Sequence, residues 1–465
     1  MAGMFEMARR FTKHDLDPEI KSKLEQLEAA ADESLRRHST IDKLPDKILQ
    51  HIFSYLSPYQ ILQSGQVCKR WRSIACSPLL WKFVSFRPNY GGIQVSNHEY
   101  FLQLIGTRFS ELRIAELTTD LITPNVLYEM ANKCPRLQHL TLDFSTAMQL
   151  HDFTDLQSFP SRLRVQLKRK SQVPFIADEH VDAISSNCAH LECLCVNYCV
   201  KVTGSCLRLV LQRCRKLKSL FLAHTSLDNN IIKAIEWEKT RIEELDVKGT
   251  ELSSDTLISL LTRLPHLRWL DASWLENMTD QVLEAWLQSG ALANLQFINL
   301  DTCDSLNEQA LSDMIIRHGP QLHGLCLGGQ HKLLEYFWMS VIPQLKNIRV
   351  IVMGIAEDCC PKVAAKIHVD QFIDCLAQNC PRLTRLEIRW DDDTLRFSDK
   401  SSKFIDVLRM KCLKLHSIVL SDGQYYELVR SNFERADRMS VVRTTEMCRT
   451  GLMHCSRFYN QLLFN

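Results

Sequence analysis

Cysteines are the residues of this chain whose type and spacing first suggest chemistry. Cys193, Cys195 and Cys199 lie close to Cys188 and His190 in the sequence. Thiolate sulfur and imidazole nitrogen are ligands that zinc prefers in proteins, but a structural site usually presents its cysteines as Cys-x-x-Cys pairs, and that spacing is missing here. The cluster therefore predicts no metal site, and small apolar fillers of a core explain the same residues.

Enzyme motifs are missing from the chain as well. We find no glycine-rich phosphate loop, no His-Glu-x-x-His pair and no nucleophile elbow. The 15 glycines among 465 residues weaken a nucleotide-binding interpretation further. We therefore predict a protein that has no catalytic residues, no cofactor and no bound metal.

The composition is that of an ordinary folded protein. Hydrophobic residues make up 45% of the chain and charged residues 24%, and the formal net charge is only +2. Such a charge provides no strong field for nucleic acid or for an anionic membrane. No apolar run reaches the roughly 18 residues of a membrane span, and the first residues lack the apolar core of a signal peptide. We expect reduced thiols and a location in the cytoplasm, the nucleus or both.

A leucine pattern recurs through most of the chain after residue 100. Between Leu191 and Leu322 the pattern Leu-x-x-Leu-x-Leu, with conservative replacements, repeats at steps of 26, 25, 25, 28 and 27 residues. These steps lie within the range of about 20–29 residues that is typical of leucine-rich repeats. The copies are Phe109/Leu112/Ile114, Leu137/Leu140/Leu142, Leu191/Leu194/Val196, Leu217/Leu220/Leu222, Ile242/Leu245/Val247, Leu267/Leu270/Ala272, Leu295/Ile298/Leu300, Leu322/Leu325/Leu327, Leu345/Ile348/Val350, Leu383/Leu386/Ile388 and Leu415/Ile418/Leu420.

Each copy predicts one short strand followed by a helix. A single unit of this kind cannot bury its apolar face alone, so neighbouring units stack into a curved solenoid. The fold class is therefore α/β, a right-handed solenoid over residues 109–421 with parallel strands on the concave face and helices on the convex face. The gap between Leu137 and Leu191 has room for a degenerate copy around Leu163 and Val165.

The concave face is the predicted site for binding another protein. Side chains that alternate with the inward leucines project to this face, because successive residues of a strand point to opposite sides. They include Phe221, Glu244, Asp246, Trp269, Asp271, Phe297, Asn299 and Asp301. Aromatic anchors in a polar setting are typical of a binding hot spot and favour a segment with Lys or Arg near apolar side chains. The alternative is that these aromatics pack on one another or under the C-terminal tail.

Residues 40–86 predict a separate helical module before the repeats. Pro45, Ser57-Pro58 and Ser77-Pro78 divide the segment into three short helices, because proline is tolerated in a first helical turn and breaks a helix elsewhere. A module of this size buries at most about 60% of its unfolded surface. Part of its abundant apolar surface must therefore face another chain or the next domain.

This module resembles the F-box motif nearly position for position. The matching residues are Leu44-Pro45, Ile48-Leu49, Ile52 to Leu56, Val67 to Trp71, and Leu80-Trp81. One departure is Lys47, where the family often has an acidic residue. The repeats resemble the cysteine-containing leucine-rich-repeat subtype, in which Cys-Pro-x-Leu starts a unit, as at Cys134 and Cys380. This subtype is the one usually found behind an F-box.

The resemblance implies a receptor subunit of an SCF-type ubiquitin ligase, without catalytic activity of its own. It implies a Skp-family adaptor as partner, with cullin and RING subunits bound through it, and an unknown protein substrate on the repeats. No nucleic-acid or membrane partner is expected. The implied adaptor-binding residues are Leu44, Pro45, Ile48, Leu49, Ile52, Phe53, Leu56, Val67, Cys68, Trp71, Leu80 and Trp81. An interaction scaffold that delivers nothing for ubiquitination is the alternative function.

The remaining segments complete the predicted domain organisation. Residues 1–39 predict a helical or partly disordered lead-in, since residues 19–37 are rich in strong helix formers. Residues 87–108 are the expected linker and N-terminal cap. Residues 422–465 carry apolar side chains near their end and are expected either to cap the last repeat or to fold back along the concave face.

Overall fold

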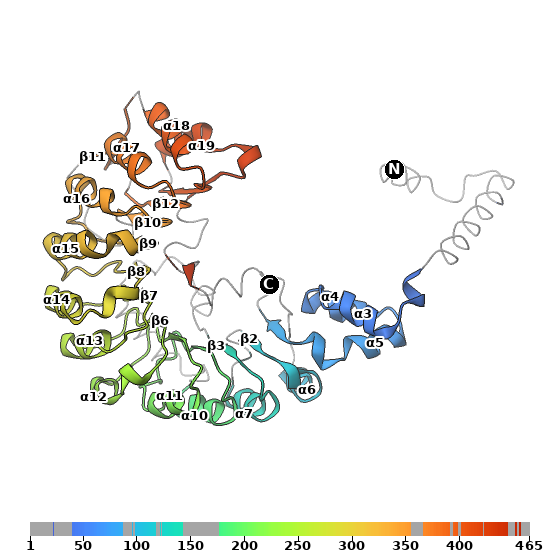
Figure 1. The fold of residues 1–465 in the computed structure, drawn as a ribbon. Coiled ribbons are helices and arrows are strands. Elements are labelled where there is room, and N and C mark those ends of the chain that lie inside the picture. Colours follow the sequence, from blue (N-terminus) through green and yellow to red (C-terminus); the bar gives the residue numbers. More distant parts are fainter. Residues whose placement is uncertain are drawn as a thin grey trace. The chain divides into compact units, whose positions relative to one another are not determined.

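The structure is a computed structural model that describes residues 22, 40–86, 95, 98–117, 121, 123–142, 176–354, 366–390, 394–398, 401–421, 423–444, 452 and 455–456 (Figure 1). The chain divides into two compact units, Met1–Leu80 and Trp81–Asn465. Apart from residue 22, the helix expected at 19–37 lies outside the described residues, as does the degenerate repeat around Leu163. In the described part of the chain, no helix has the length and apolar character of a membrane span.

The first unit contains the three helices that the prolines predicted. They are α3 (Asp46–Phe53), α4 (Pro58–Ser64) and α5 (Lys69–Ala75), flanked by the 3₁₀ turns η1 (Thr40–Lys43) and η2 (Pro78–Leu80). Ser57 caps α4, because its side chain accepts from the Gln60 N–H while the Gln60 side chain accepts from the Ser57 N–H. This reciprocal pair is a capping box. Cys68 caps α5 in a similar way, with its sulfur accepting from the Trp71 N–H at 3.4 Å.

The second unit is a leucine-rich-repeat solenoid, which confirms the predicted fold class. Thirteen described strands form one sheet, and every pairing within it is parallel. The strands are β1 (Phe83–Ser85), β2 (Ile114–Leu117), β3 (His139–Leu142), β4 (Cys193–Cys195), β5 (Ser219–Phe221), β6 (Glu244–Asp246), β7 (Trp269–Asp271), β8 (Phe297–Asn299), β9 (Gly324–Cys326), β10 (Val350–Met353), β12 (Arg385–Ile388), β14 (Ser417–Leu420) and β15 (Val441–Thr444). A separate pair is β11 (Ile367–His368) with β13 (Leu395–Arg396).

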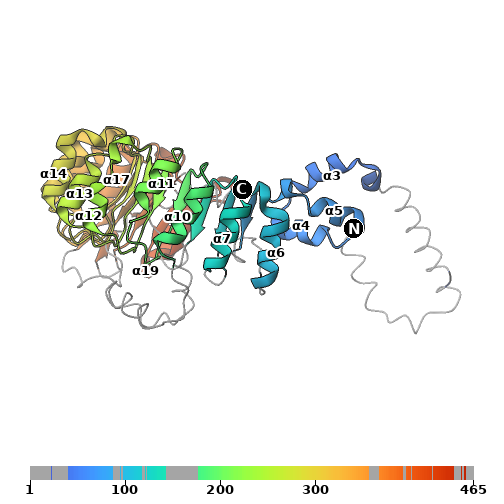
Figure 2. The same ribbon diagram turned by 90° about the horizontal axis from the view of Figure 1, so that it is seen from below.

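Helices cover the outer side of this sheet, as Figure 2 shows for the stretch from α10 to α14. Their apolar faces bury residues such as Leu257 and Trp286 beneath them, both 0% exposed. The helices are α6 (His98–Arg108), α7 (Pro124–Lys133), α10 (Asp178–Asn187), α11 (Leu207–Arg213), α12 (Asn229–Ala234), α13 (Ser254–Leu261), α14 (Asp280–Ser289), α15 (Glu308–His318), α16 (Glu335–Val341), α17 (Val369–Asn379), α18 (Ser401–Lys411) and α19 (Gln424–Phe433). One outer helix per strand is what the repeat period predicted.

The sheet extends beyond the predicted repeat range at both ends. Strand β1 comes from the end of the segment assigned to the helical module, so the two units divide after Leu80 rather than at residue 86. At the other end, α19 and β15 add a further helix and strand inside the segment expected to be a cap or tail. Neither Phe83–Ser85 nor Val441–Thr444 carries the leucine pattern, and the pairing with a neighbouring strand stabilises each of them.

Buried cysteines connect successive repeats at the ends of the helices. The Cys188 sulfur lies 3.5 Å from the Cys134 carbonyl oxygen, and the Cys214 sulfur lies 3.5 Å from the Cys188 carbonyl oxygen. Near the C-terminal end, the Cys412 sulfur lies 3.2 Å from the Cys380 carbonyl oxygen. Burial raises the pKa of the Cys188 thiol to about 12, so it remains protonated and donates this weak hydrogen bond. These cysteines therefore serve as structural residues of the solenoid.

A left-handed residue follows several strands at the same position of the repeat. Tyr198 (φ 63°), His224 (φ 53°) and Gly249 (φ 58°) occupy this position in three consecutive repeats. The His224 N–H donates to the Lys248 carbonyl oxygen at 2.8 Å, and the Tyr198 and His224 rings stack at 4.5 Å. A Cβ atom on Gly249 would lie 2.3 Å from the His224 ring, so glycine is needed there for both space and φ.

Candidate functional site

An apolar stripe on α3 faces solvent in the first unit. Ile48 is 46% exposed, Ile52 is 39% exposed and Tyr55, just past the helix, is 78% exposed. Val67, which precedes α5, is 67% exposed. A cluster of this kind on a small module is characteristic of a protein-binding surface.

The predicted adaptor-binding residues differ in their exposure. Exposed ones are Pro45, Ile48, Ile52, Val67 and Cys68, half-buried ones are Leu44, Leu56 and Trp71, and buried ones are Leu49, Phe53, Leu80 and Trp81. The exposed set can contact a partner without any change in the module.

The four buried residues correct the sequence analysis, which assigned them to direct adaptor contact. Phe53 packs edge-to-face on Trp71, with 5.2 Å between the ring centroids. Trp81 belongs to the second unit, where its ring lies 6.1 Å from that of Phe109 and beneath the Arg108 guanidinium. An amphipathic helix needs an inner face, and sequence spacing alone does not separate that face from an outer apolar one. Phe53 therefore packs inside the first unit behind the outer stripe, whereas Trp81 packs inside the repeats.

Polar contacts fix α3 against the rest of its unit. The Arg70 guanidinium on α5 forms an ion pair with Asp46 at 2.7 Å and also donates to the Leu44 carbonyl oxygen. The Gln50 side chain donates to the Ser77 hydroxyl at 2.5 Å. These contacts orient the first turn and the middle of α3, so the exposed stripe is presented by a fixed helix.

The concave face of the second unit carries the predicted row of aromatic and acidic side chains. The strand register places Phe221 beside Asp246, and Trp269 beside both Glu244 and Phe297. Cys193, Cys195, Phe221 and Trp269 form one apolar cluster, against which the half-buried Phe297 packs. These side chains therefore share one face of the sheet, as their spacing predicted.

The described C-terminal residues Leu452, Cys455 and Ser456, here named the C-terminal strap, lie on this face. Figure 1 shows them in red on the inner side of the strands. The Trp269 indole N–H donates to the Leu452 carbonyl oxygen at 3.3 Å, and the Ser456 hydroxyl donates to Glu244 at 3.2 Å. Cys455 packs against the cluster that contains Trp269. At these residues, the tail folds back along the concave face, which settles one of the two alternatives left by the sequence.

The strap covers several of the predicted substrate-binding residues. Phe221 is 0% exposed and Trp269 is 1% exposed, while Glu244, Asp246, Asp271 and Asn299 are buried as well. Gly324 leaves room for the strap, since a Cβ there would lie 3.0 Å from the Leu452 side chain and 2.5 Å from Phe297. The expectation that Trp269 and Phe221 are open anchors for another protein is thus wrong in this structure, because the protein's own tail occupies them.

Hydrogen bonds also satisfy the carboxylates of this face. Asp271 accepts from the Asn299 amide at 2.8 Å and from the Ser273 hydroxyl at 2.5 Å. Glu244 accepts from the Ser219 hydroxyl at 2.6 Å. These hydrogen bonds offset part of the cost of burying the two carboxylates and occupy acceptor positions that a bound peptide would otherwise use.

Asp301 is held by a contact that crosses several repeats. The Arg389 guanidinium lies 2.6 Å from Asp301 and 2.8 Å from Glu387, which is 0% exposed in its side chain. Burial disfavours the charged form of Arg389, but Asp301 and Glu387 raise its pKa above the ordinary value overall. The same balance applies to Lys248. Burial lowers its pKa, but its neighbours Tyr198 and Asp271 raise it more, so the pKa is above its ordinary value. The carboxylates around Arg389 and Lys248 therefore stabilise the charged form of each cation.

The cysteines first considered as zinc ligands lie in separate environments. Cys193 and Cys195 lie in the concave apolar cluster, whereas the sulfurs of Cys188 and Cys199 lie within 3.6 Å of carbonyl oxygens at other points of the fold. In the part of the chain that the structure describes, no group of three or more His, Cys, Asp or Glu is arranged to hold a metal ion.

Known proteins share both parts of this arrangement. A family model described as F-box-like matches residues 41–87. F-box/LRR-repeat protein 12 of Homo sapiens is 26% identical over 240 residues, which cover 50% of this chain and 70% of that protein. The chain therefore combines an F-box-like segment with a solenoid of leucine-rich repeats. Putative F-box/LRR-repeat protein 22 of Arabidopsis thaliana is 24% identical over 213 residues, which cover 34% of this chain and 69% of that protein.

A solved structure of the Rad7 and Elc1 complex from yeast matches with a TM-score of 0.39 and 14% identity, covering 79% of this chain and 93% of that chain.

The return of the tail to the concave face was one of two expectations from the sequence, but its contacts could not be predicted, because they join residues as far as 183 positions apart. Two further features were not predicted. They are the Arg389–Asp301 pair, which joins residues 88 positions apart, and a basic pocket beside α11. The pairs of cations at Arg215-Lys216 and near Arg241 were visible in the sequence, but their convergence requires the stacking of two repeats.

Proposed function

We propose that this chain is the substrate-recognition subunit of an SCF-type ubiquitin ligase. The F-box binds a Skp-family adaptor, which connects it to cullin and RING subunits, and the repeats bind the protein to be ubiquitinated. The exposed stripe of Ile48, Ile52 and Tyr55 carries the proposal, since it lies within the residues that match the F-box-like family. Burying these apolar side chains against an adaptor removes them from water, which lowers the free energy of the complex.

The proposed contribution of the chain to the reaction is proximity. Bond formation takes place on other subunits, while this chain holds the target near the charged ubiquitin carrier. Joining two reactants on one scaffold raises their effective concentration and restricts their relative orientation. A solenoid with a continuous parallel sheet suits this role, because each repeat is fixed by its neighbours.

Target binding is expected outside the apolar centre of the concave face. The strap fills that centre, and the buried carboxylates Glu244 and Asp271 already accept hydrogen bonds. A target therefore meets the rims and edges of the repeats first, or contacts the strap itself.

Affinity purification tests the proposed function. The double variant Ile48→Asp/Ile52→Asp places two carboxylates in the exposed stripe without disturbing the buried Leu49 and Phe53. We expect it to lose the adaptor and cullin, while proteins bound to the repeats are retained under proteasome inhibition. Ile316→Asp is a control for adding a carboxylate at an exposed apolar position, because Ile316 is 52% exposed on α15, far along the sequence from the F-box-like segment.

The result also separates the receptor from a scaffold. Retention of adaptor and cullin by the double variant would overturn the assignment of the stripe. If the adaptor depends on the stripe but no bound partner accumulates when the chain is depleted, the non-degradative scaffold is the better description.

A further inference from the structure

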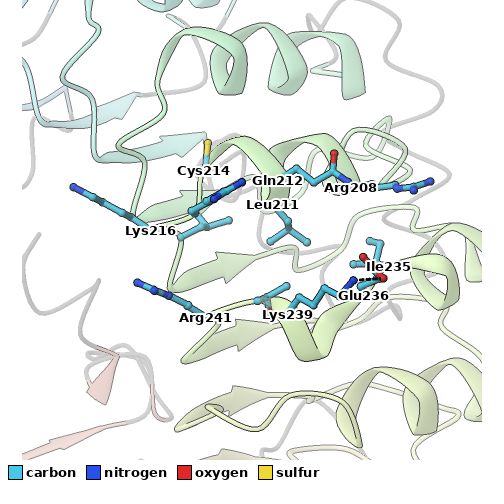
Figure 3. Close-up of a pocket in the computed structure, with 12 residues that line it drawn as sticks. Arg208, Leu211, Gln212, Cys214, Lys216, Ile235, Glu236, Lys239 and Arg241 are labelled. Carbon is cyan, nitrogen blue, oxygen red and sulfur yellow. Dashed lines mark hydrogen bonds and ion pairs between the residues drawn. The ribbon is translucent and has the colours of Figure 1, made fainter.

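A basic pocket lies at the edge where the helices of two repeats lead into their strands. It has a volume of about 830 Å³ and is formed by α11, the loop between α11 and β5, and residues 235–241 (Figure 3). Figure 3 shows Lys216 and Arg241 toward one end of the pocket, with Arg208 and Glu236 toward the other. The concave cluster and the strap contribute no residue to its lining.

The local sequence explains why the two repeats leave this space. Helix α12 ends at Ala234, and Ile235 continues in an extended conformation with φ −75° and ψ 138°. The next residues form the 3₁₀ turn η7 (Trp237–Lys239), in which Trp237 is buried and its indole N–H donates to the Ile232 carbonyl oxygen at 2.9 Å. The extended residue and this turn bring Ile235, Glu236 and Lys239 into the lining of the pocket.

Cations predominate among the charged residues of the pocket. Arg208, Arg215, Lys216, Lys239 and Arg241 are exposed, and the lining contains one carboxylate, that of Glu236. Lys239 neutralises Glu236 at 2.6 Å, whereas Arg215, Lys216 and Arg241 form no ion pair with any residue that the structure describes. The side of the pocket toward β5 and β6 therefore has a net positive charge.

The positive surface continues past the pocket into the next repeat. An adjoining pocket of about 390 Å³ is lined by Lys218, Arg241 and Arg268, with Glu243 paired to Lys218 at 2.7 Å. Arg241 lines both pockets and joins them. The cations are thus spread along an edge, rather than gathered around one point.

The floor of the basic pocket is apolar. Leu217 and Ile235 are 2% and 3% exposed, and Leu211 is half-buried between them and solvent. No aromatic side chain belongs to the lining, so bases of a nucleic acid would find no stacking surface there.

We propose that this edge binds an acidic peptide segment of the target protein, with spaced carboxylates on the cations and apolar side chains on the floor. Separated cations suit several carboxylates along an extended chain, whereas a single phosphate requires converging donors. Identifying the peptide as part of a ubiquitination target rests on the proposed function, but peptide binding itself does not. The basic edge then supplies the target contact that the strap-covered concave centre does not offer.

The test uses the full chain and a short fluorescein-labelled peptide in which Glu and Leu alternate, titrated by fluorescence anisotropy. We expect binding that weakens as salt increases, because exposed ion pairs are screened. The double variant Lys216→Glu/Arg241→Glu should bind the peptide at least about tenfold more weakly, since two attractions become repulsions. Both side chains are exposed, so this variant should fold normally.

The matched control is Arg317→Glu/Lys346→Glu, which makes the same change of net charge at exposed positions outside the pocket. Equal weakening by the two double variants would overturn the site. Tighter binding of a phosphoserine peptide or of single-stranded RNA than of the Glu/Leu peptide would overturn the choice of occupant. Adaptor co-purification is measured on the same variants. If the Lys216→Glu/Arg241→Glu variant loses the peptide but keeps the adaptor, the result supports the pocket as the peptide site. If the wild-type chain binds the peptide but co-purifies with no adaptor, the proposed ligase role is refuted and the peptide site is not.

Discussion

Substituting Leu452 by Ala should release the C-terminal strap from the concave face. Leu452 is 1% exposed and packs in a cluster with Cys326, Val350 and Val352. Truncating a buried leucine to alanine costs about 2–5 kcal/mol, and a segment near its end that relaxes locally should show the lower value. A loss of about 2 kcal/mol corresponds to a roughly thirtyfold larger population of the released strap.

The thiol of Cys455 reports this release directly. Burial raises its pKa to about 12 in the docked strap, so almost no reactive thiolate is present near neutral pH. Release returns the pKa toward its ordinary value and fully exposes the side chain, which is half-buried in the docked strap. Labelling with a maleimide at pH 7, followed by mass spectrometry of the peptide containing Cys455, should therefore be about thirtyfold faster in Leu452→Ala, in proportion to the released population.

Two controls make this prediction refutable. Leu306→Ala removes an equally buried leucine, 1% exposed, from another part of the repeats and should leave the labelling of Cys455 unchanged under native conditions. Cys68 is exposed in the F-box and provides an internal standard for the reagent. The reasoning fails if Cys455 of the wild type is labelled as fast as Cys68, or if Leu452→Ala leaves its rate unaltered.

Three further substitutions test the packing of the repeats. Burial raises the pKa of Asp178, but hydrogen bonds from the Thr203 and Cys206 backbone N–H groups lower it below its ordinary value overall. Asp178→Asn should therefore cost about 1 kcal/mol at pH 7, since solvent screens this half-buried carboxylate, and this difference in urea unfolding should vanish as pH falls through the lowered pKa of the wild type. Gly249→Ala, at φ 58° and against a histidine ring, should cost about 2 kcal/mol and lower the melting temperature. Arg389→Met leaves Glu387 and Asp301 without their shared cation and should cost about 3 kcal/mol in chemical unfolding, with Glu387→Gln restoring part of the loss.

Local signals in the sequence were sufficient for most of the secondary structure. Ser57 and Pro58 predicted the start of α4, because capping and the fixed proline φ act within one turn. Leucines such as Leu217 and Leu220 predicted the position of strand β5 and its buried side, because the leucine spacing depends only on residues within the same repeat. Strands β1 and β15 were missed, since their pairing depends on a neighbour rather than on a pattern of their own.

The exposure of a side chain was the property that the sequence did not determine. Trp269 and Glu244 project to the concave face as predicted, yet both are buried because Leu452 and Ser456 return to them from the end of the chain. Nothing in the spacing of the residues around Leu452 indicates where they dock. The same applies to Ile48 and Leu49, neighbours on one helix, of which one is 46% exposed and the other 0%. Contacts between residues far apart in the sequence decide whether such a side chain is exposed, and the repeat pattern does not predict those contacts.

The C-terminal strap has a consequence for how this array can evolve. In the sheet, each strand pairs only with its neighbours in sequence order, and repeats of that kind can be duplicated or deleted with little effect on distant ones. The strap contacts β6 and β7 and also the cluster on β9 and β10, so it bridges strands that are not adjacent in the sheet. A repeat inserted between Trp269 and Val350 would move these strands apart, while the length of the strap would stay the same. The number of repeats in this stretch is therefore constrained by a few residues at the far end of the chain.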